Sequence, residues 1–246
     1  MAFDHLSFEK FKELAQDQTS SKYEKIGFPN EYRQSFEKAI FSDIRQKLSN
    51  LKNKESMVLD IGPGCSDLPQ MIIQEATHLE QTLYLVDSKE MLDLLPDQNN
   101  IKKIPGCFPN ETLDLIQAHQ EKFDVLLCYS VFHYIFAEGN IFHFFDCCLS
   151  LLAHGGQMLL GDIPNISKRK RFFSSPQGIQ FHQNFTKAQE MPSVQFNHLD
   201  MKHIDDGVLL GLMMRARNAG FDAYLVPQNP DLPMANRRED LFIIRP

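Results

Sequence analysis

The fold is decided by the stretch Met57-Val58-Leu59-Asp60-Ile61-Gly62-Pro63-Gly64-Cys65-Ser66-Asp67. Its first five residues form a short apolar run, which is typical of a strand buried in a parallel sheet. The Gly-Pro-Gly turn that follows ends the strand and lets the backbone turn sharply. Because glycine carries no Cβ, the same turn leaves room for a ligand to approach the backbone. We therefore expect a strand, a tight ligand-binding loop and a helix.

The alternation of strand and helix continues along the chain. We expect further strands at residues 82–86, 101–104, 123–128, 157–161, 223–226 and 241–244, and helices near 68–77, 89–95, 111–119, 141–152 and 206–219. Gly155-Gly156 is expected to stop the helix that precedes it. This order implies right-handed crossovers. The prediction is an α/β fold: a doubly wound, mostly parallel seven-stranded sheet with helices on both faces and an antiparallel last strand.

Two segments stand outside this pattern. Residues 1–52 predict an N-terminal helical extension, because apolar residues recur there at helical spacing, with a loop expected between Tyr23 and Tyr32. Residues 53–246 form the expected main domain, interrupted by an irregular, polar insertion at about 164–205. The extension could cap a binding site or pair two subunits. The sequence leaves the oligomeric state open, a homodimer being one arrangement.

Composition excludes several classes of protein. The 246 residues include 43% hydrophobic residues, too many for a disordered chain, and 32 acidic against 25 basic residues, a balance that argues against a nucleic-acid partner. The five cysteines show no zinc-ligand spacing, so we expect no metal site. Residues 1–10 lack the apolar core of a signal peptide, and no apolar run is long enough to span a membrane. We expect a cytoplasmic protein without a membrane partner.

A second acidic position indicates the kind of ligand. In doubly wound sheets ligands bind beyond the carboxyl ends of the strands. Asp87 follows the second expected strand and could accept hydrogen bonds from both hydroxyls of a ribose. A pyrophosphate loop would need a third glycine where Asp67 stands, and an acidic residue at a helix N-terminus repels phosphate. S-adenosylmethionine, which has a ribose but no phosphate, fits this pattern, and Asp60 supplies an anion near its cationic groups.

At these residues the sequence resembles the class I S-adenosylmethionine-dependent methyltransferases, over roughly Met57 to Ile163. Matching blocks are Asp60-x-Gly62-x-Gly64 with Ser66 in the third glycine position, Asp87, the segment 123–135, and Leu151–Leu160 with its Gly-Gly pair. The resemblance implies a methyltransferase. Its cofactor-binding residues would be Asp60, Gly62, Pro63, Gly64, Asp87, Ser88, Met91, Phe108, Tyr129 and Ser130. Phe108 would stack on the adenine in place of the acidic residue that many members have nearby, and Asn110 would bond its edge.

Candidate catalytic residues are His133, His182 and Asp162. Transfer of a methyl group to a hydroxyl or amine requires removal of a proton, and histidine is the natural base near neutral pH. Asp162 follows the fifth strand and could bind an acceptor hydroxyl or pair with the base. For each histidine a structural role is the competing interpretation: packing over the cofactor for His133, a surface loop for His182.

Basic residues gather beside the expected acceptor site. Candidate substrate-binding residues are Lys168, Arg169, Arg171, Arg237 and Arg238. Arginine binds carboxylate or phosphate through two hydrogen bonds, so an anionic small-molecule acceptor is the hypothesis, although a charge run is usually only a solvated face. The loops around 161–171 and 231–240 are similar to methyltransferase-like proteins of bacterial surface-polysaccharide clusters. That likeness implies a sugar or nucleotide-sugar acceptor and a role in polysaccharide biosynthesis.

Three other functions are alternatives. A nucleotide-dependent oxidoreductase could use a similar sheet, but the missing third glycine and Asp67 disfavour it. A methyltransferase-like protein that binds the cofactor without turnover is the non-enzymatic alternative. Methylation of nucleic acid is disfavoured by the acidic balance and by Tyr129-Ser130-Val131-Phe132, which stands where an Asn/Asp-Pro-Pro-Tyr/Phe motif would lie.

Overall fold

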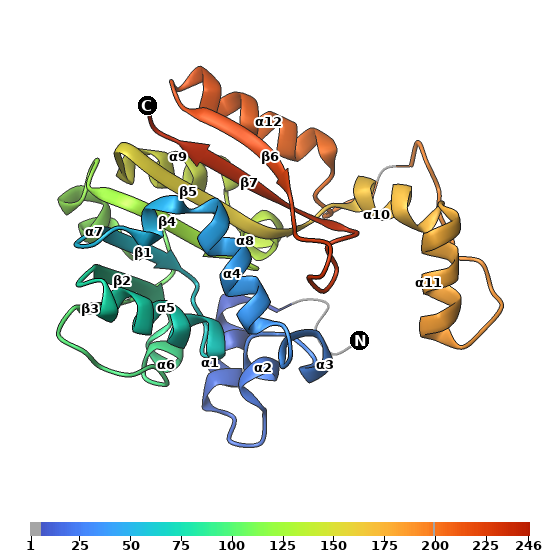
Figure 1. Ribbon diagram of the computed structural model, residues 1–246, viewed down its shortest axis with the longest axis horizontal. Coiled ribbons are helices and arrows are strands. Elements are labelled where there is room, and N and C mark those ends of the chain that lie inside the picture. Colours follow the sequence, from blue (N-terminus) through green and yellow to red (C-terminus); the bar gives the residue numbers. More distant parts are fainter. Residues whose placement is uncertain (1–5, 199) are drawn as a thin grey trace.

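A seven-stranded sheet forms the centre of the protein in the computed structural model, which describes residues 6–198 and 200–246 (Figure 1). The strand order is β3-β2-β1-β4-β5-β7-β6, and β7 runs antiparallel to both of its neighbours. The predicted doubly wound, mostly parallel sheet with an antiparallel last strand is therefore confirmed. The strands are β1 (Met57–Ile61), β2 (Thr82–Asp87), β3 (Ile101–Pro105), β4 (Phe123–Tyr129), β5 (Leu152–Pro164), β6 (Asp222–Pro227) and β7 (Arg238–Ile244).

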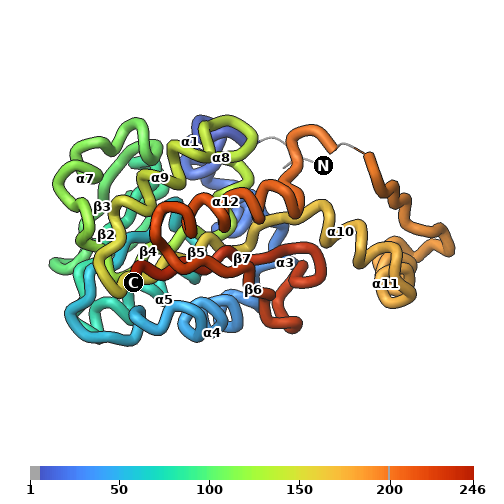
Figure 2. Tube along the Cα trace, turned by 90° about the horizontal axis from the view of Figure 1, so that it is seen from above, coloured from blue at the N-terminus to red at the C-terminus, as the bar shows by residue number. Residues whose placement is uncertain are grey.

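Helices cover both faces of this sheet, as the view from above shows (Figure 2). The helices α4 and α5 lie on one face, whereas α9 and α12 lie on the other. The helices that follow the first strand are α5 (Asp67–His78), α6 (Lys89–Leu92), α7 (Leu113–Ala118), α8 (Phe132–Glu138), α9 (Ile141–Leu151), α10 (Ile166–Phe173), α11 (Pro176–Thr186) and α12 (Asp206–Asn218).

The strands are apolar on both sides because each side is covered. In β1, Val58 packs into the core beneath α4 and α5, while Leu59 packs into the core beneath α9 and α12. In β4, Leu127 and Leu126 divide in the same way. This two-sided burial explains why these strands are continuous apolar runs rather than alternating ones.

The N-terminal extension contains more helix than we expected. It comprises α1 (Phe8–Gln16), α2 (Lys22–Lys25), α3 (Asn30–Arg33), α4 (Glu37–Lys47) and a 3₁₀ turn at Ser49–Lys52. The expected loop at 23–32 thus holds parts of two single-turn helices. Ser21 begins α2 with a capping box, in which its hydroxyl accepts a bond from the Glu24 amide and the Glu24 carboxylate accepts one from the Ser21 amide. Residues 1–5 of the expected extension lie outside the described residues.

The insertion at about 164–205 is not the irregular stretch that we expected, because α10 and α11 fill its first half and project away from the sheet (Figure 1). Asn165 caps α10 by accepting bonds from the amides of Ser167 (2.9 Å) and Lys168 (3.2 Å). Ser175 caps α11, with Pro176 in its first turn. Both capping residues can be recognised in the sequence. We nevertheless expected an irregular segment, because it is polar and lacks a clear apolar periodicity.

The expectation for Gly155-Gly156 was also wrong. Helix α9 ends at Leu151, and β5 begins directly at Leu152, so the glycines lie inside the strand. Gly155 has a φ of +75°, and a Cβ on Gly156 would lie only 2.8 Å from the Phe123 carbonyl oxygen. The two glycines therefore allow an irregularity in the β4–β5 pairing, at which the two backbones come close together.

Within the parts of the chain that the structure describes, no helix combines the length and the apolar character needed to cross a bilayer.

Candidate functional site

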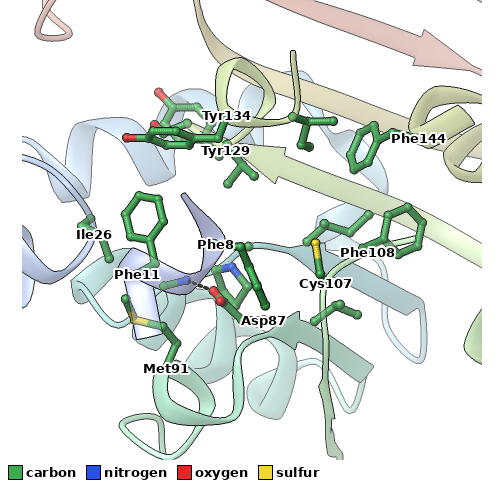
Figure 3. A pocket seen from close by; sticks show the side chains of 18 of the residues that line it. Phe8, Phe11, Ile26, Asp87, Met91, Cys107, Phe108, Tyr129, Tyr134 and Phe144 are labelled. Atoms are coloured by element: carbon green, nitrogen blue, oxygen red, sulfur yellow. Dashed lines mark hydrogen bonds between the residues drawn. The ribbon is translucent and has the colours of Figure 1, made fainter. Parts of the chain in front are cut away.

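A cavity of about 310 Å³ lies beyond the carboxyl ends of three adjacent strands (Figure 3). Its floor includes Ile61, which ends β1, and Gly62 after it, Asp87 at the end of β2, and Tyr129, which ends β4, with Ser130 after it. This is the edge of the sheet where doubly wound folds bind ligands. The predicted cofactor-binding residues that line the cavity are Gly62, Pro63, Gly64, Asp87, Met91, Phe108, Tyr129 and Ser130.

The loop after β1 requires its two glycines. Gly62 and Gly64 have φ values of +71° and +65°, in the left-handed region that other residues rarely adopt. A Cβ on Gly62 would lie 2.6 Å from Val131 Cγ2, and one on Gly64 would lie 2.5 Å from Ile26 Cγ2. The loop is therefore packed tightly between the segment after β4 and the N-terminal extension.

Asp87 links this loop to the second strand. One oxygen of its carboxylate accepts a hydrogen bond from the Gly64 amide (3.0 Å). The other oxygen accepts one from the Ser88 amide (2.7 Å). Burial raises its pKa to about 6, although the two amides lower it. Each carboxylate oxygen can accept another bond, so the group can still receive two ligand hydroxyls.

Two of the predicted cofactor-binding residues do not line the cavity. Asp60 is buried within β1, where desolvation and the neighbouring Asp87 raise its pKa to about 8. Ser88 is also buried, and its hydroxyl caps α6 by accepting a bond from the Met91 amide (3.2 Å). Ser88 thus positions Met91, which does line the cavity.

The loop after β3 supplies another wall. Phe108 is buried and packs edge-on against Phe144 of α9, with ring centroids 5.4 Å apart. Phe108 and Asn110, the two residues that we assigned to an adenine, both line the cavity. Their roles stay predictions.

The N-terminal extension forms the cover of the cavity, which the sequence left undecided. Phe8, Phe11, Ile26, Phe28 and Arg33 all line it. Figure 3 shows Phe8 and Phe11 of α1 among the side chains that line the cavity, and Phe11 packs edge-on against Tyr134 of α8, with ring centroids 5.0 Å apart. Apolar residues at helical spacing signalled helices here, but nothing in the sequence indicated where those helices would pack.

The extension also covers the N-terminus of α5. Asp67, at the start of that helix, forms an ion pair with Lys22 and accepts a hydrogen bond from the Tyr23 hydroxyl (2.9 Å). A dinucleotide would place its pyrophosphate at this helix end. Because α2 occupies that position, the geometry disfavours a dinucleotide for a second reason, beyond the charge of Asp67.

Asp162 lies behind the cavity in a buried polar network. Its carboxylate accepts bonds from Arg238 Nη1 (2.7 Å), from Gln228 Nε2 (3.2 Å) and from the hydroxyl of Ser130. The same hydroxyl accepts a bond from Arg33 Nη2 (2.7 Å). Asp162 is therefore paired with Arg238 and does not line the cavity.

The two candidate histidines lie apart from each other. His133 is in α8, and burial together with the nearby Arg238 lowers its pKa to about 3, so the ring is neutral at neutral pH. His182 is in α11, packed edge-on against Phe173 on the projecting helix pair. Neither side chain lines the cavity, and their catalytic roles remain predictions.

The basic residues are mostly paired within the chain. Lys168 lies near Glu239, Arg171 pairs with Asp206, and Arg238 pairs with Asp162. Arg169 and Arg237 have no carboxylate in ion-pair distance among the described residues. They lie over the rings of Phe173 (5.0 Å) and Phe181 (5.9 Å), respectively. The structure also shows no group of three or more potential metal ligands within residues 6–198 and 200–246.

Comparisons with known proteins address the fold. No family model and no curated protein matches the sequence, whereas many solved structures match the architecture. The plantazolicin methyltransferase BpumL, solved with a monoazolic desmethylPZN analog and S-adenosylhomocysteine, is 15% identical with a TM-score of 0.58, and the match covers 97% of this chain and 96% of BpumL. The fold is that of a Rossmann-like methyltransferase.

Two further structures with this fold have different stated activities. The N-methyltransferase NodS from Bradyrhizobium japonicum, solved with S-adenosylhomocysteine, is 11% identical with a TM-score of 0.56, and the match covers 97% of this chain and 98% of NodS. The carbon methyltransferase CurJ is 12% identical with a TM-score of 0.56, and the match covers 97% of this chain and 58% of CurJ. Since their acceptor atoms differ, the Rossmann-like methyltransferase fold does not determine the acceptor.

Proposed function

We propose that this chain is an S-adenosylmethionine-dependent methyltransferase. The observation that carries the proposal is Asp87, whose carboxylate is hydrogen-bonded to the glycine loop and faces a cavity at the carboxyl ends of the strands. Proteins with the same fold bind S-adenosylhomocysteine, as BpumL and NodS do in their solved structures.

The residues present fit this cofactor. Asp87 would hold the ribose hydroxyls, and Phe108 with Met91 would enclose the adenine. The cavity wall is largely apolar, in keeping with a nucleoside ligand that carries no phosphate. When bound, S-adenosylmethionine supplies a methyl group on a sulfonium, and the task of the chain is to hold an acceptor in line with it.

The aromatic cover formed by the N-terminal extension would exclude water from that reaction. A hydroxyl or amine acceptor must also lose a proton. His133, His182 and Asp162 remain the candidates for this role. His133 is a weak base because its pKa is depressed, and the Asp162 carboxylate is held by Arg238.

For the acceptor we propose a small anionic molecule. Arg169 and Arg237 support this proposal. Of the five candidate substrate-binding residues, these two have no carboxylate in ion-pair distance among the described residues. Burial lowers the pKa of Arg237, and a ligand anion would offset that burial. A sugar or nucleotide-sugar acceptor, and a role in polysaccharide biosynthesis, are supported only by the sequence similarity of the loops around 161–171 and 231–240 to the polysaccharide-cluster proteins.

Thermal unfolding with added ligands tests the function. S-adenosylmethionine and S-adenosylhomocysteine should raise the melting temperature, and NAD should not. A ligand at 100 times its dissociation constant adds about 2.7 kcal/mol to the free energy of unfolding. Stabilisation by NAD alone would favour the oxidoreductase. Stabilisation by S-adenosylhomocysteine with no labelled product from sugar, nucleotide or peptide acceptors would favour a non-catalytic binding protein.

Substitution of the two free arginines tests the acceptor class. Arg169→Ala and Arg237→Ala should raise the Michaelis constant for the acceptor and leave that for the cofactor unchanged. Arg215→Ala is the matched control, because Arg215 is an exposed arginine on α12 already paired with Asp146. An unchanged acceptor constant in both variants would contradict the anionic acceptor.

A further inference from the structure

The two helices that project from the sheet carry an exposed aromatic surface. We call α10 and α11, residues 166–186, the aromatic arm (Figure 1). Phe181 and Phe185 of α11 are 40% and 64% exposed, and their rings are nearly parallel, with centroids 6.4 Å apart. Phe181 also packs against Phe172 and Phe173 of α10. Adjoining exposed rings of this kind are typical of a surface that binds a ligand or a partner.

Helix α11 carries no formal charge. Its residues, Pro176–Thr186, include no Asp, Glu, Lys or Arg, although these four types make up 23% of the whole chain. The solvent-facing side of a surface helix is usually charged or polar. The apolar part of a ligand can therefore lie on the rings of α11 without desolvating a charged side chain of that helix.

Two cations border these rings and lack a carboxylate partner. The Arg169 guanidinium lies 5.0 Å from the Phe173 ring centroid, and that of Arg237 lies 5.9 Å from the Phe181 ring centroid. Neither has a carboxylate in ion-pair distance among the described residues. Arg237 Nη1 donates a hydrogen bond to the side-chain oxygen of Asn236 (3.1 Å), which carries no charge. The positive charge at this surface is therefore not balanced by a neighbouring carboxylate within the described chain.

A similar pair elsewhere in the chain has its own anion. Arg215 lies 4.9 Å from the ring centroid of Phe142, which is 49% exposed. The Arg215 guanidinium donates two hydrogen bonds to the Asp146 carboxylate (2.7 and 2.6 Å). At the aromatic arm the corresponding carboxylate is lacking among the described residues. Charge complementarity therefore indicates an occupant that carries an anionic group next to an apolar part.

The aromatic arm leaves the sheet at the edge where the cavity lies. Strand β5 is parallel to β4, and α10 begins two residues after β5 ends at Pro164. The Asn165 amide donates to the Arg237 carbonyl (3.0 Å), so Arg237 lies at the base of the arm. The neighbouring Arg238 lies 5.6 Å from the ring centroid of Phe28, which lines the cavity. A ligand held at Arg237 is therefore near both the cavity wall and the exposed rings.

We propose that the aromatic arm binds an amphiphilic anion, an apolar chain next to one carboxylate or phosphate, and that the acceptor belongs to this class. Arg169 and Arg237 hold the anionic group, and Phe181 and Phe185 contact the apolar chain. This inference rests on the proposed function and makes its anionic acceptor amphiphilic. The apolar chain supplies affinity that an anion at an exposed arginine does not, because water and salt screen that ion pair.

Titration followed by NMR tests the inference with three probes. Octanoate has an anion and an apolar chain, acetate has the anion alone, and octyl glucoside has the chain with an uncharged head group. Each is used below the concentration at which it forms micelles. Octanoate should bind at least 10-fold more tightly than either other probe, with the largest shifts in α11. A 10-fold preference over acetate is about 1.4 kcal/mol, less than the burial of two methylene groups provides.

Variants separate the two parts of the site. Arg169→Gln combined with Arg237→Gln should reduce the affinity for octanoate to that for octyl glucoside. Phe185→Ser should weaken octanoate and octyl glucoside alike and leave acetate unchanged. Arg215→Gln and Phe142→Ser are the matched controls, since that arginine is already paired with Asp146, and they should change none of the three affinities. Thermal unfolding of each variant reports folding independently of binding.

The outcomes distinguish this inference from the proposed function. Equal affinity for octanoate and acetate, or octanoate binding unchanged in the folded double-arginine variant, would overturn the amphiphilic site. Dimerisation that Phe185→Ser abolishes would also overturn it, because a second copy would then cover the rings. Binding to phosphatidylglycerol vesicles without binding of octanoate would overturn it in favour of a bilayer. Failure to bind S-adenosylhomocysteine would instead overturn the proposed methyltransferase, and the acceptor role of the arm with it, but not the binding of octanoate.

Discussion

At the scale of single residues, the cavity and the strand ends beneath it hold groups whose environment differs from water. Asp60 and Asp87 are neighbouring carboxylates whose pKa values are raised by burial, to about 8 and about 6. Gly62 and Gly64 adopt backbone conformations that other residues rarely adopt. Arg33 has an unsatisfied nitrogen. Such groups lower the stability of a chain and are common where a ligand binds.

Asp60→Asn should make the chain more stable than wild type, by a margin that grows as the pH rises. Because the folded-state pKa of Asp60 is above its unfolded value, the protonated form favours the native state, and stability is lost as the pH rises from about 4 to about 8. Asp60→Asn removes this loss. We expect its free energy of unfolding to match wild type near pH 4 and exceed it by on the order of 2–5 kcal/mol at pH 8.5.

Urea denaturation across this pH range checks the prediction. Asp222→Asn, at an exposed position of β6, is the control and should follow the wild-type curve. A difference between Asp60→Asn and wild type that does not grow with pH would contradict a raised pKa for Asp60.

Gly64→Ala should destabilise the chain by about 2–4 kcal/mol. The substitution forces a left-handed conformation on alanine and drives its Cβ against Ile26 Cγ2. Chemical denaturation measures the loss. Gly211→Ala is the control in the same chain, since a Cβ there meets no atom within 4 Å in a helix interior, and it should stabilise by about 0.5–1 kcal/mol. Equal effects of the two substitutions would contradict the close packing of the loop.

At the scale of elements, the two segments added to the sheet differ in how they are held. The extension is tied to the main domain by the Lys22–Asp67 ion pair, by Ile26 over the glycine loop and by the buried Arg33. Helix α11, by contrast, packs its aromatic rings mainly against α10, and Phe181 and Phe185 remain exposed. An element held by so few buried contacts opens at a small cost in free energy.

Hydrogen exchange should therefore separate α11 from the sheet. The amides of α11 should exchange at least 100-fold faster than those of β4, which lies in the middle of the sheet and is almost wholly buried. Exchange read by mass spectrometry on peptides from both segments gives the comparison. Protection of α11 equal to that of β4 would show that the projecting helices are covered in solution.

At the scale of the whole molecule, the cavity is closed by parts that are distant in sequence. Strand ends form its floor, the loop after β3 and α9 form a side, and the N-terminal extension forms its cover. The free energy of ligand binding is therefore coupled to the packing of the extension on the main domain. A ligand in the cavity would contact both parts at once.

S-adenosylhomocysteine should protect the extension from exchange and proteolysis. Amides of α1 should exchange at least 10-fold more slowly with saturating ligand, because opening of the extension then requires loss of the bound ligand. Amides of α12, on the face of the sheet away from α4 and α5 and outside the cavity lining, serve as the reference and should change little. Unchanged protection of α1 with ligand bound would contradict its role as a cover.

The positions of the strands along the chain, the mostly parallel sheet with its antiparallel last strand, and the glycine loop with Asp87 could be predicted from the sequence. These features depend on local properties: apolar runs, turn residues and the position of a carboxylate after a strand. Capping at Asn165 and Ser175 is equally local, so α10 and α11 could have been predicted from it despite the polarity of their segment.

Tertiary packing determines what covers the site and which charges lack a partner among the described residues. Arg33 lies just after the expected loop at 23–32. Its contacts with Phe28, Tyr129 and Ser130 depend on tertiary packing, since Ser130 is 97 residues away in the sequence. Likewise, Asp162 and Arg238 neutralise each other through a contact between β5 and β7. Pairing of buried charges depends on the packing of distant segments, which periodicity and spacing along the chain do not encode.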